Sequence, residues 1–336
     1  MKRVGIPRAL LFYQYFPMWK TFFEHLGAEI VTSPPTNLEI LQMGISRTAP
    51  ETCLPVKVFC GHAAWLCDKC DYLFIPGIRS LRPESYNCAK FLGLPDIVRA
   101  VVPEAPPIID PDIELPKGRV ELYLAIYKVG SLFTKNPLRI KQAAEAAWEA
   151  HRAYLNLMSA RKLTAPRAIA EICRDPFFRE PPKLPGSERS LRVAVIGHPY
   201  IIYDDFINHS LLRRLERMGI EVSTPEMIPK KELERKVLEI VGRFYWTYED
   251  EVTGAGGYYL DEDPNVDGVI AVQAFGCGPD SLMLGMLEHH AKRSSRKPFL
   301  ILTLDEHTSD VGLVTRLEAF VDMIIRRKRI SQLQRA

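Results

Sequence analysis

The chain of 336 residues is long enough for about two domains. Its hydrophobic fraction of 47% and charged fraction of 25% are typical of a folded globular protein and exclude a disordered chain. The formal net charge of +3 is too small to indicate binding to nucleic acid. No stretch approaches the roughly 18 consecutive apolar residues of a membrane helix. Because the first residues do not resemble a signal peptide, we expect a cytoplasmic protein that binds neither nucleic acid nor membranes.

The first third of the chain alternates apolar strand patterns with helical ones. The expected elements are a strand at residues 3–7, a helix over 9–26, a strand at 28–34, helices over 37–45 and from 55 to about 67, a strand at 71–78 and a helix over about 90–101. Strands that alternate with helices predict a parallel, doubly wound sheet.

A proline-rich segment at residues 102–117 predicts a boundary, and residues 118–174 have an almost wholly helical pattern. After a second linker, strands are expected at residues 191–200, 220–227, 266–276 and 298–305, with helices between and after them. The sequence therefore predicts two α/β domains joined by a helical segment. Their expected limits are 1–117 for the N-terminal α/β domain, 118–190 for the helical connector and linker, and 191–336 for the C-terminal α/β domain.

The cysteines carry the first indication of function. The seven are an odd number in a long chain, which argues against a disulfide scaffold. Five of them fall between Cys53 and Cys88. In a cytoplasmic protein such clustering indicates metal binding, redox chemistry or buried apolar thiols.

Three cysteines lie where loops meet helices. Cys53 stands at the start of a predicted helix, where backbone N–H groups favour a thiolate. Cys88 and Cys277 each follow a predicted strand, at the edge where open α/β sheets bind ligands. Gly276 and Gly278 flank Cys277 and would let a bulky group approach the backbone. If the two halves face each other, the three thiolates could converge on one iron–sulfur cluster, or they could hold zinc with an open position.

The remaining clustered cysteines are Cys60, Cys67 and Cys70. Steps of seven residues from Cys53 correspond to about 10 Å along a helix, so Cys53 and Cys67 are too far apart to share one four-iron cube. Cys60 is interpreted as a core residue, although it could reach a second or larger cluster. The Cys67–Cys70 pair alone lacks the four ligands of a structural metal site.

Two loops offer acid–base groups. Glu306 and His307 follow the last predicted strand and are candidate catalytic residues. The alternative is that Thr308 or Ser309 caps the final helix and the acids are solvated. His198 follows another predicted strand, where it could be a ligand, a proton donor or a structural residue.

Several segments together resemble a known family. They are GIPRALLFYQYFPMWKTFFEHLGAEIV, ETCLPVKVFCGH, DYLFIPGI, CAKFLGLPD, IGHPYIIYDDFIN, QAFGCGPDS and LDEHTSDVGLVTRLEAFVD, in the family's order and over nearly the whole chain. They resemble the iron–sulfur subunits of the 2-hydroxyacyl-CoA dehydratases, also known as the 2-hydroxyglutaryl-CoA dehydratase D-component superfamily. The resemblance is closer to the acyl-CoA dehydratase activase-related proteins.

The resemblance implies Rossmann-like halves around a cysteine-bound 4Fe-4S cluster, with Cys53, Cys88 and Cys277 at the ligand positions. In the dehydratases the cluster passes one electron to a 2-hydroxyacyl-CoA thioester, and the resulting radical loses water. That electron comes from a separate ATP-hydrolysing activase. The resemblance thus implies an anaerobic lyase or reductase acting on an acyl-CoA or small molecule, with an activase partner and a homodimer or heterodimer with a related subunit.

The chain departs from this family at three points. Ala89 stands where relatives often have proline after the second ligand, and His198 stands where they often have arginine. The sequence shows no ATPase domain of the kind often fused to activase-related proteins, so a separate ATPase partner is expected. Cys60, Cys67 and Cys70 leave open a double-cubane cluster. The alternatives to an enzyme are a non-catalytic electron-relay subunit and a zinc-binding structural homologue.

Overall fold

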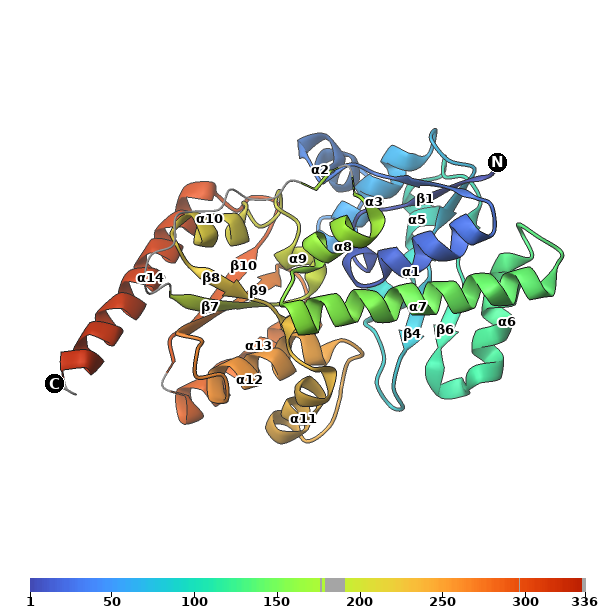
Figure 1. Cartoon of the computed structure of the whole chain (residues 1–336). Coiled ribbons are helices and arrows are strands. Elements are labelled where there is room, and N and C mark those ends of the chain that lie inside the picture. The colour runs from blue at the N-terminus through green and yellow to red at the C-terminus, as the bar shows by residue number, and fades with distance from the viewer. Residues whose placement is uncertain (176, 179–190, 296, 334–336) are drawn as a thin grey trace. The chain divides into compact units, whose positions relative to one another are not determined.

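The computed structural model describes residues 1–175, 177–178, 191–295 and 297–333. Contacts divide the chain into two units. Unit 1 is Met1–Glu180 together with Phe244–Tyr248, and unit 2 is Pro181–Arg243 together with Glu249–Ala336. Figure 1 shows a parallel sheet in each, and the predicted α/β class with parallel sheets is confirmed.

Unit 1 is built on a four-stranded sheet in the order β2-β1-β3-β5, with every pair parallel. The strands are β1 (Arg3–Ile6), β2 (Glu29–Thr32), β3 (Tyr72–Phe74) and β5 (Ile108–Ile109). Because β2 and β3 lie on opposite sides of β1, the order of the strands reverses between β1 and β3. In open α/β sheets this is the point at which ligands bind, beyond the carboxyl ends of the strands.

The single strand predicted at residues 71–78 is wrong, since the structure divides it in two. β3 ends at Phe74, and β4 (Gly77–Ser80) pairs instead with β6 (Asp112–Glu114) in a separate two-stranded sheet. Pro76 lies between them, and a proline has no N–H to donate to a strand ladder. The proline-rich segment 102–117 accordingly contributes β5 and β6.

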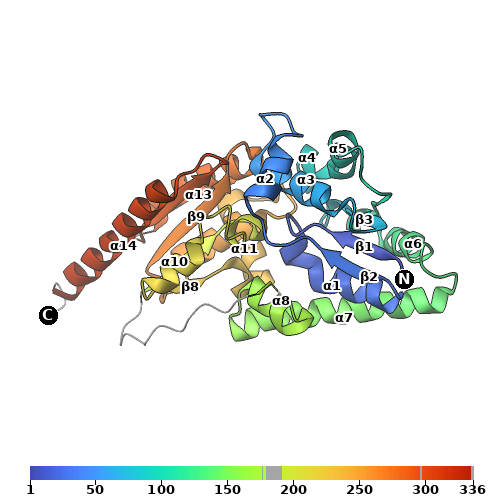
Figure 2. The same cartoon turned by 90° about the horizontal axis from the view of Figure 1, so that it is seen from above.

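The helices of unit 1 confirm the predicted pattern, including the helical segment after residue 118. They are α1 (Phe12–His25), α2 (Leu38–Ile45), α3 (Leu54–Leu66), α4 (Ala89–Leu92), α5 (Leu94–Val101), the 3-10 turn η1 (Leu115–Lys117), α6 (Arg119–Gly130), α7 (Pro137–Arg161) and α8 (Ala165–Cys173). In Figure 2, α7 runs along α1. The described part of the segment predicted as a connector therefore packs within unit 1.

Two glycines hold α3 against α2. A Cβ atom on Gly44 would lie 1.9 Å from the Lys57 carbonyl oxygen, and one on Gly61 would lie 2.0 Å from the Ile40 carbonyl oxygen. Only glycine permits backbones to approach this closely. The contact fixes the position of α3, which begins directly after Cys53.

Unit 2 contains the second sheet, in the order β10-β9-β7-β8, again wholly parallel. Its strands are β7 (Arg192–Ile196), β8 (Glu221–Ser223), β9 (Gly268–Ala274) and β10 (Phe299–Leu304). The strand order reverses between β7 and β9, so a second binding edge is expected there.

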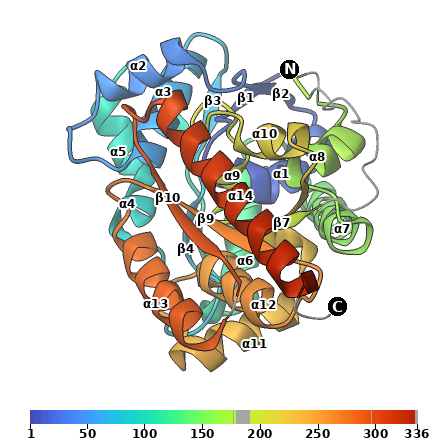
Figure 3. The same cartoon turned by 90° about the vertical axis from the view of Figure 1, so that its left-hand side faces the viewer.

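Helices cover both faces of the second sheet. They are α9 (Pro199–Ile202), α10 (Leu211–Arg217), the 3-10 turn η2 (Pro225–Met227), α11 (Lys230–Val241), the π-helix η3 (Asp250–Gly254), α12 (Ala255–Asp261), α13 (Gly278–Ser294) and α14 (Asp310–Leu333). Figure 1 shows α10 on one side of the sheet and α12 and α13 on the other. In Figure 3, α14 crosses β9, where Ile324 packs against Gly268.

Candidate functional site

The three cysteines predicted as ligands share one local geometry. Cys53, Cys88 and Cys277 are the N-cap residues of α3, α4 and α13, and each has an extended backbone. None of their side chains makes a capping hydrogen bond to the helix that follows. The unsatisfied N–H groups of a first helical turn favour negative charge at this position. The three positions thus suit thiolates, whereas a serine or aspartate would bond to the turn.

In unit 1 the loops of Cys53 and Cys88 are tied together. The Lys90 ammonium, in the first turn of α4, donates a 3.1 Å hydrogen bond to the carbonyl of Glu51. Cys53 is buried, with 8% of its surface exposed, and Cys88 is half-buried. Cys277 lies in unit 2, so its convergence with the other two stays a prediction.

The segment Phe244–Tyr248 supports the loop before Cys88. The backbone N–H of Thr247 donates to the Tyr86 carbonyl at 3.3 Å, and the Arg82 guanidinium donates to the Thr247 carbonyl at 2.8 Å. The same guanidinium stacks on the ring of Phe244 at 4.1 Å. The approach to Cys88 is therefore held by a segment distant in sequence.

The other clustered cysteines behave as core thiols. Cys60 is fully buried, and its burial, with the neighbouring Cys53 second, raises the pKa of the thiol to about 12. The Cys67 and Cys70 thiols donate to the carbonyls of Ala63 and Leu66 at 3.4 and 3.2 Å. Burial raises the pKa of each to about 11. Burial and contacts of this kind favour the interpretation of Cys60 and Cys70 as buried core thiols and of Cys67 as a half-buried thiol bonded within its own helix.

The turn that carries Cys277 depends on its glycines. Gly276 has a φ of +77°, in the region where a side chain is strained, and it allows β9 to turn into α13. A Cβ atom on Gly278 would meet nothing within 4 Å. The Ser281 hydroxyl donates to the Cys277 carbonyl at 2.8 Å. The predicted role of Gly276 and Gly278 in admitting a cofactor stays a prediction.

His198 has a clearer environment than the sequence indicated. It follows β7, and its Nδ1 lies 2.7 Å from Oε2 of Glu251, while its Nε2 lies 2.9 Å from Oδ1 of Asp280. Burial alone would lower the pKa of the imidazole, but the charges and hydrogen bonds of Asp280 and Glu251 raise it to about 10. His198 is therefore an imidazolium at neutral pH. Nδ1 is thus hydrogen-bonded to Glu251 and Nε2 is ion-paired with Asp280, so both ring nitrogens face carboxyl groups.

A further carboxyl group, that of Glu226, lies after β8 at the same edge of the second sheet. The Tyr203 hydroxyl is 2.9 Å from Oε2 of Glu226 and 2.9 Å from the Thr224 hydroxyl. Burial raises the pKa of Glu226 to about 7, with a further upward contribution from the nearby Glu251. Groups whose pKa values are shifted in this way gather at functional sites. We name His198, Glu226, Glu251 and Asp280 the His198 cluster.

Three members of this cluster, Asp280, Glu226 and Glu251, were not predicted from the sequence. Asp280 stands in the same turn as Cys277, and its position at the start of a helix after a strand was the available signal. Glu226 lies near the end of the strand predicted at 220–227. The sequence around Glu251 carries no signal for its position, because Glu251 lies in the π-helix η3. A π-helix has about one more residue per turn than an α-helix, and hydrophobic periodicity does not predict it.

Glu306 and His307 lie in a turn that Asp305 organises. Oδ1 of Asp305 accepts hydrogen bonds from the backbone N–H of His307 and the Thr308 hydroxyl, both at 2.9 Å. Ser309 accepts from the N–H of Gly312 at 3.1 Å, as a helix cap does. His307 is exposed and Glu306 is half-buried. These contacts are typical of a capped helix start, and the catalytic role of the two residues stays a prediction.

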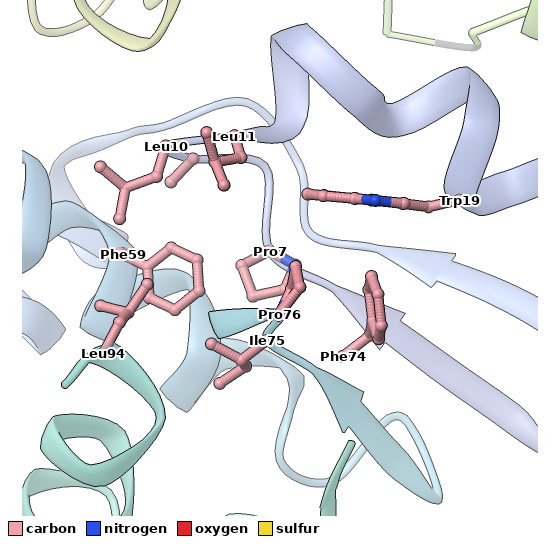
Figure 4. A pocket seen from close by; sticks show the side chains of 10 residues that line it. Pro7, Leu10, Leu11, Trp19, Phe59, Phe74, Ile75, Pro76 and Leu94 are labelled. Carbon is pink, nitrogen blue, oxygen red and sulfur yellow. The ribbon is translucent and has the colours of Figure 1, made fainter. Parts of the chain in front are cut away.

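At the binding edge of the first sheet, a hollow of about 10 Å³ lies where Pro7 and Ile75 leave β1 and β3, which is room for about one water molecule. Figure 4 shows its apolar lining, with Leu10, Phe59 and Trp19 around it. A groove of about 610 Å³ lies instead on unit 2, along α13 and past Ile240 of α11. Its volume is in the range of small-molecule sites, and it begins at Ser281, one turn from Cys277.

Within the described ranges, no group of three or more His, Cys, Asp or Glu side chains is placed to hold a metal ion. None of the helices described is long and apolar enough to cross a membrane. The structure is thus that of an α/β protein with parallel sheets in which three cysteines stand at the N-cap positions of helices, two in unit 1 and one in unit 2.

Residues 3–228 match the model of the family described as "CoA enzyme activase uncharacterised domain (DUF2229)". Because the match covers more than half of the chain, the chain belongs to this family. The matched region contains Cys53, Cys88, His198 and Glu226, and it ends before Glu251, Cys277 and Asp280. A comparison with curated proteins finds no match. The activase-related part of the predicted resemblance is therefore confirmed at the level of the family.

Proposed function

We propose that this protein carries an iron–sulfur cluster on Cys53, Cys88 and Cys277 and belongs functionally with the 2-hydroxyacyl-CoA dehydratases. It accepts low-potential electrons from an ATP-dependent partner and uses them for the radical dehydration or reduction of an acyl-CoA or small molecule. The observation that carries the proposal is that the three cysteines all cap helices without a side-chain capping bond. The Lys90–Glu51 hydrogen bond, which ties two of the three loops together, supports it.

The donor set fits such a group. When bound, a cluster supplies one-electron chemistry at low potential. Three thiolates are one ligand short of a complete four-cysteine set, which leaves a position for a substrate or another ligand. Cys60 is fully buried, and the thiols of Cys67 and Cys70 donate to the backbone carbonyls of Ala63 and Leu66, which favours a single cluster over a double-cubane one.

The His198 cluster supplies the proton chemistry in this proposal. Loss of water from a hydroxyl group is faster when an acid protonates the leaving oxygen. Glu226, with a pKa of about 7, holds a proton at its carboxyl group near neutral pH and can also release it. His198 keeps its proton, with a pKa of about 10, between the side chains of Glu251 and Asp280.

The groove on unit 2 is the proposed place for the substrate. Leu282 and Met286 line its apolar part, and His289 and Arg293 lie along the same helix towards its far end. An apolar wall followed by basic groups suits a molecule with an acyl part and an anionic part. This arrangement supports an acyl thioester over a wholly polar metabolite.

An electron-relay role, in which the chain passes the electron to a CoA enzyme, is the second candidate. The observation in its favour is the hollow at the β1/β3 edge, which at about 10 Å³ is too small for a substrate. The family's description as a CoA enzyme activase supports it as well. A relay needs the cluster but binds no substrate, so acyl-CoA titration of the iron-loaded protein separates the two candidates.

The test is anaerobic purification followed by counts of iron, acid-labile sulfide and zinc. We expect about four irons per wild-type chain, a loss of this iron in Cys277→Ser, and full retention in Cys173→Ser. Cys173 lies in α8 and serves as the matched control. About eight irons would contradict the three-ligand set and make Cys60, Cys67 and Cys70 ligands. No iron after anaerobic reconstitution would overturn the proposal and favour a zinc-binding or metal-free protein.

A further inference from the structure

Helix α6 is apolar on almost every side, yet little of it is buried. Its sequence, RVELYLAIYKVG, has apolar residues at most positions, but only Val129 and Gly130 are buried. A helix that is hydrophobic all round is normally covered on all sides. The main contacts of α6 within unit 1 are with α7, β6 and η1, and Ile126 packs against the core cluster around Leu26 and Ile140; Figure 1 shows α6 near α7 and β6.

The uncovered face forms a continuous stripe. Val120, Tyr123, Leu124 and Tyr127 have exposed fractions of 71%, 61%, 57% and 46%. Their spacing of three, four and seven residues places them on one side of the helix. We name these four residues the α6 stripe. Two of them are tyrosines, a residue type enriched at the energetic centres of protein interfaces.

Charges along one edge of the stripe indicate what covers it. Glu121 and Lys128 are seven residues apart, so they lie two turns apart along the same edge, beside Leu124. Neither side chain makes an ion pair with any residue that the structure describes. When two copies of a helix pack antiparallel, matching edges face each other. Glu121 of each copy then lies opposite Lys128 of the other.

We propose that the α6 stripe is a two-fold contact between two copies of this chain, with the α6 helices antiparallel. The symmetry makes the contact self-complementary, because one helix supplies both the apolar stripe and the opposite charges. In a parallel arrangement each edge faces the opposite edge of the partner, so Glu121 and Lys128 would not meet. The stripe offers about 400 Å² per copy and thus about 800 Å² in total, which is below the roughly 1,200–2,000 Å² of a stable interface, so the dimer is expected to be weak and concentration-dependent.

This contact is independent of the proposed iron–sulfur function. The α6 stripe carries none of the proposed ligands, and loss of the dimer leaves the iron count per chain unchanged. Iron loading and oligomeric state are therefore separate measurements, and failure of one proposal is distinguishable from failure of the other.

The test is sedimentation velocity over a range of concentrations on the full chain. We expect wild type to shift from monomer to dimer as concentration rises. Glu121→Lys alone, or Lys128→Glu alone, places like charges opposite each other twice and should raise the dissociation constant by about tenfold or more. An equal mixture of the two variants should form a heterodimer, and the double variant Glu121→Lys/Lys128→Glu should recover the wild-type dimer.

Tyr123→Glu tests the apolar part of the same contact, and it should also give a monomer. Leu238→Glu is the matched control, since Leu238 is 51% exposed on α11 and outside the stripe. Circular dichroism and the melting temperature show that each variant is folded. A wild-type protein that stays monomeric at every concentration would overturn the proposal. So would a dimer that both single charge variants retain, or a mixture of the two that does not associate.

Discussion

Nε2 of His198 lies 2.9 Å from Oδ1 of Asp280, so a cation at the end of β7 is bonded to the first turn of the helix that follows β9. Asp280 is only 1% exposed, and Cys277 stands three residues before it. The ion pair therefore bridges the point at which the strand order of the second sheet reverses. It fixes the turn that presents Cys277.

Removing the cation leaves two carboxylates without their charge partner. We expect His198→Ala to lower the free energy of unfolding by about 3–5 kcal/mol, because a buried ion pair that loses one member leaves an uncompensated charge. His198→Arg should retain most of the stability, since it keeps a cation. Urea denaturation measures both. His307→Ala, at an exposed histidine, is the control and should change stability by less than about 0.5 kcal/mol.

The same histidine predicts a dependence of stability on pH. The pKa of His198 is raised from 6.5 in the unfolded chain to about 10 in the folded protein. The stabilisation is therefore fully present below pH 6.5 and is lost as the pH rises towards 10. We expect the free energy of unfolding to fall by up to about 1.4 kcal/mol per pH unit in this range from this group. The slope should be absent from His198→Arg, and a wild-type slope equal to that of the variant would contradict the assignment.

Glu226 predicts a second pH effect, in a lower range. Its pKa is raised from 4.5 to about 7, so the folded protein holds a proton that the unfolded chain has released. Stability from this group is present below pH 4.5 and declines as the pH rises to about 7. Glu226→Gln keeps an oxygen that can accept a hydrogen bond from the Tyr203 hydroxyl, but it has no carboxyl group to titrate. The free energy of unfolding of Glu226→Gln, relative to that of wild type, should rise between pH 4.5 and 7 and stay constant above pH 7. For the surface variant Glu221→Gln this difference should not change over the same range.

Replacement by alanine should have opposite effects at two glycines, one in the contact between α2 and α3 and one in α13. Gly61→Ala would place a Cβ atom 2.0 Å from the Ile40 carbonyl oxygen, and we expect it to cost about 1–3 kcal/mol or more. Gly285→Ala lies in a helix where a Cβ atom meets nothing within 4 Å, and it should stabilise the protein by about 0.5–1 kcal/mol. Thermal and urea denaturation measure both, and equal effects would show that α2 and α3 do not pack as described.

The buried thiols predict a pattern of alkylation in the metal-free protein. Cys60, with a pKa of about 12, and Cys70, with a pKa of about 11, should resist iodoacetamide at pH 8, since only the thiolate reacts. The half-buried Cys88 and Cys277 should react first. Peptide mass spectrometry over time gives the order, and early modification of Cys60 would contradict its place in the core.

Local pattern determined much of this protein. Apolar spacing predicted most of the strands and helices, because the periods of two and 3.6 residues are properties of a single segment. Cys53 and Cys277 were placed at helix starts from the prolines two residues after them, because proline suits a first helical turn. These predictions do not depend on contacts with segments distant in the sequence.

The tertiary structure alone decided the rest. Whether His198 was a ligand, a donor or a structural residue depended on Glu251, 53 residues away in the chain, and on Asp280 after another strand. The strand order β10-β9-β7-β8 brings their segments to one edge, and a π-helix turns Glu251 towards it. In the same way, the separation of β3 from β4 followed from the partners that each strand found. Charge and pairing of this kind arise between segments distant in sequence, and only the packed fold brings such segments together.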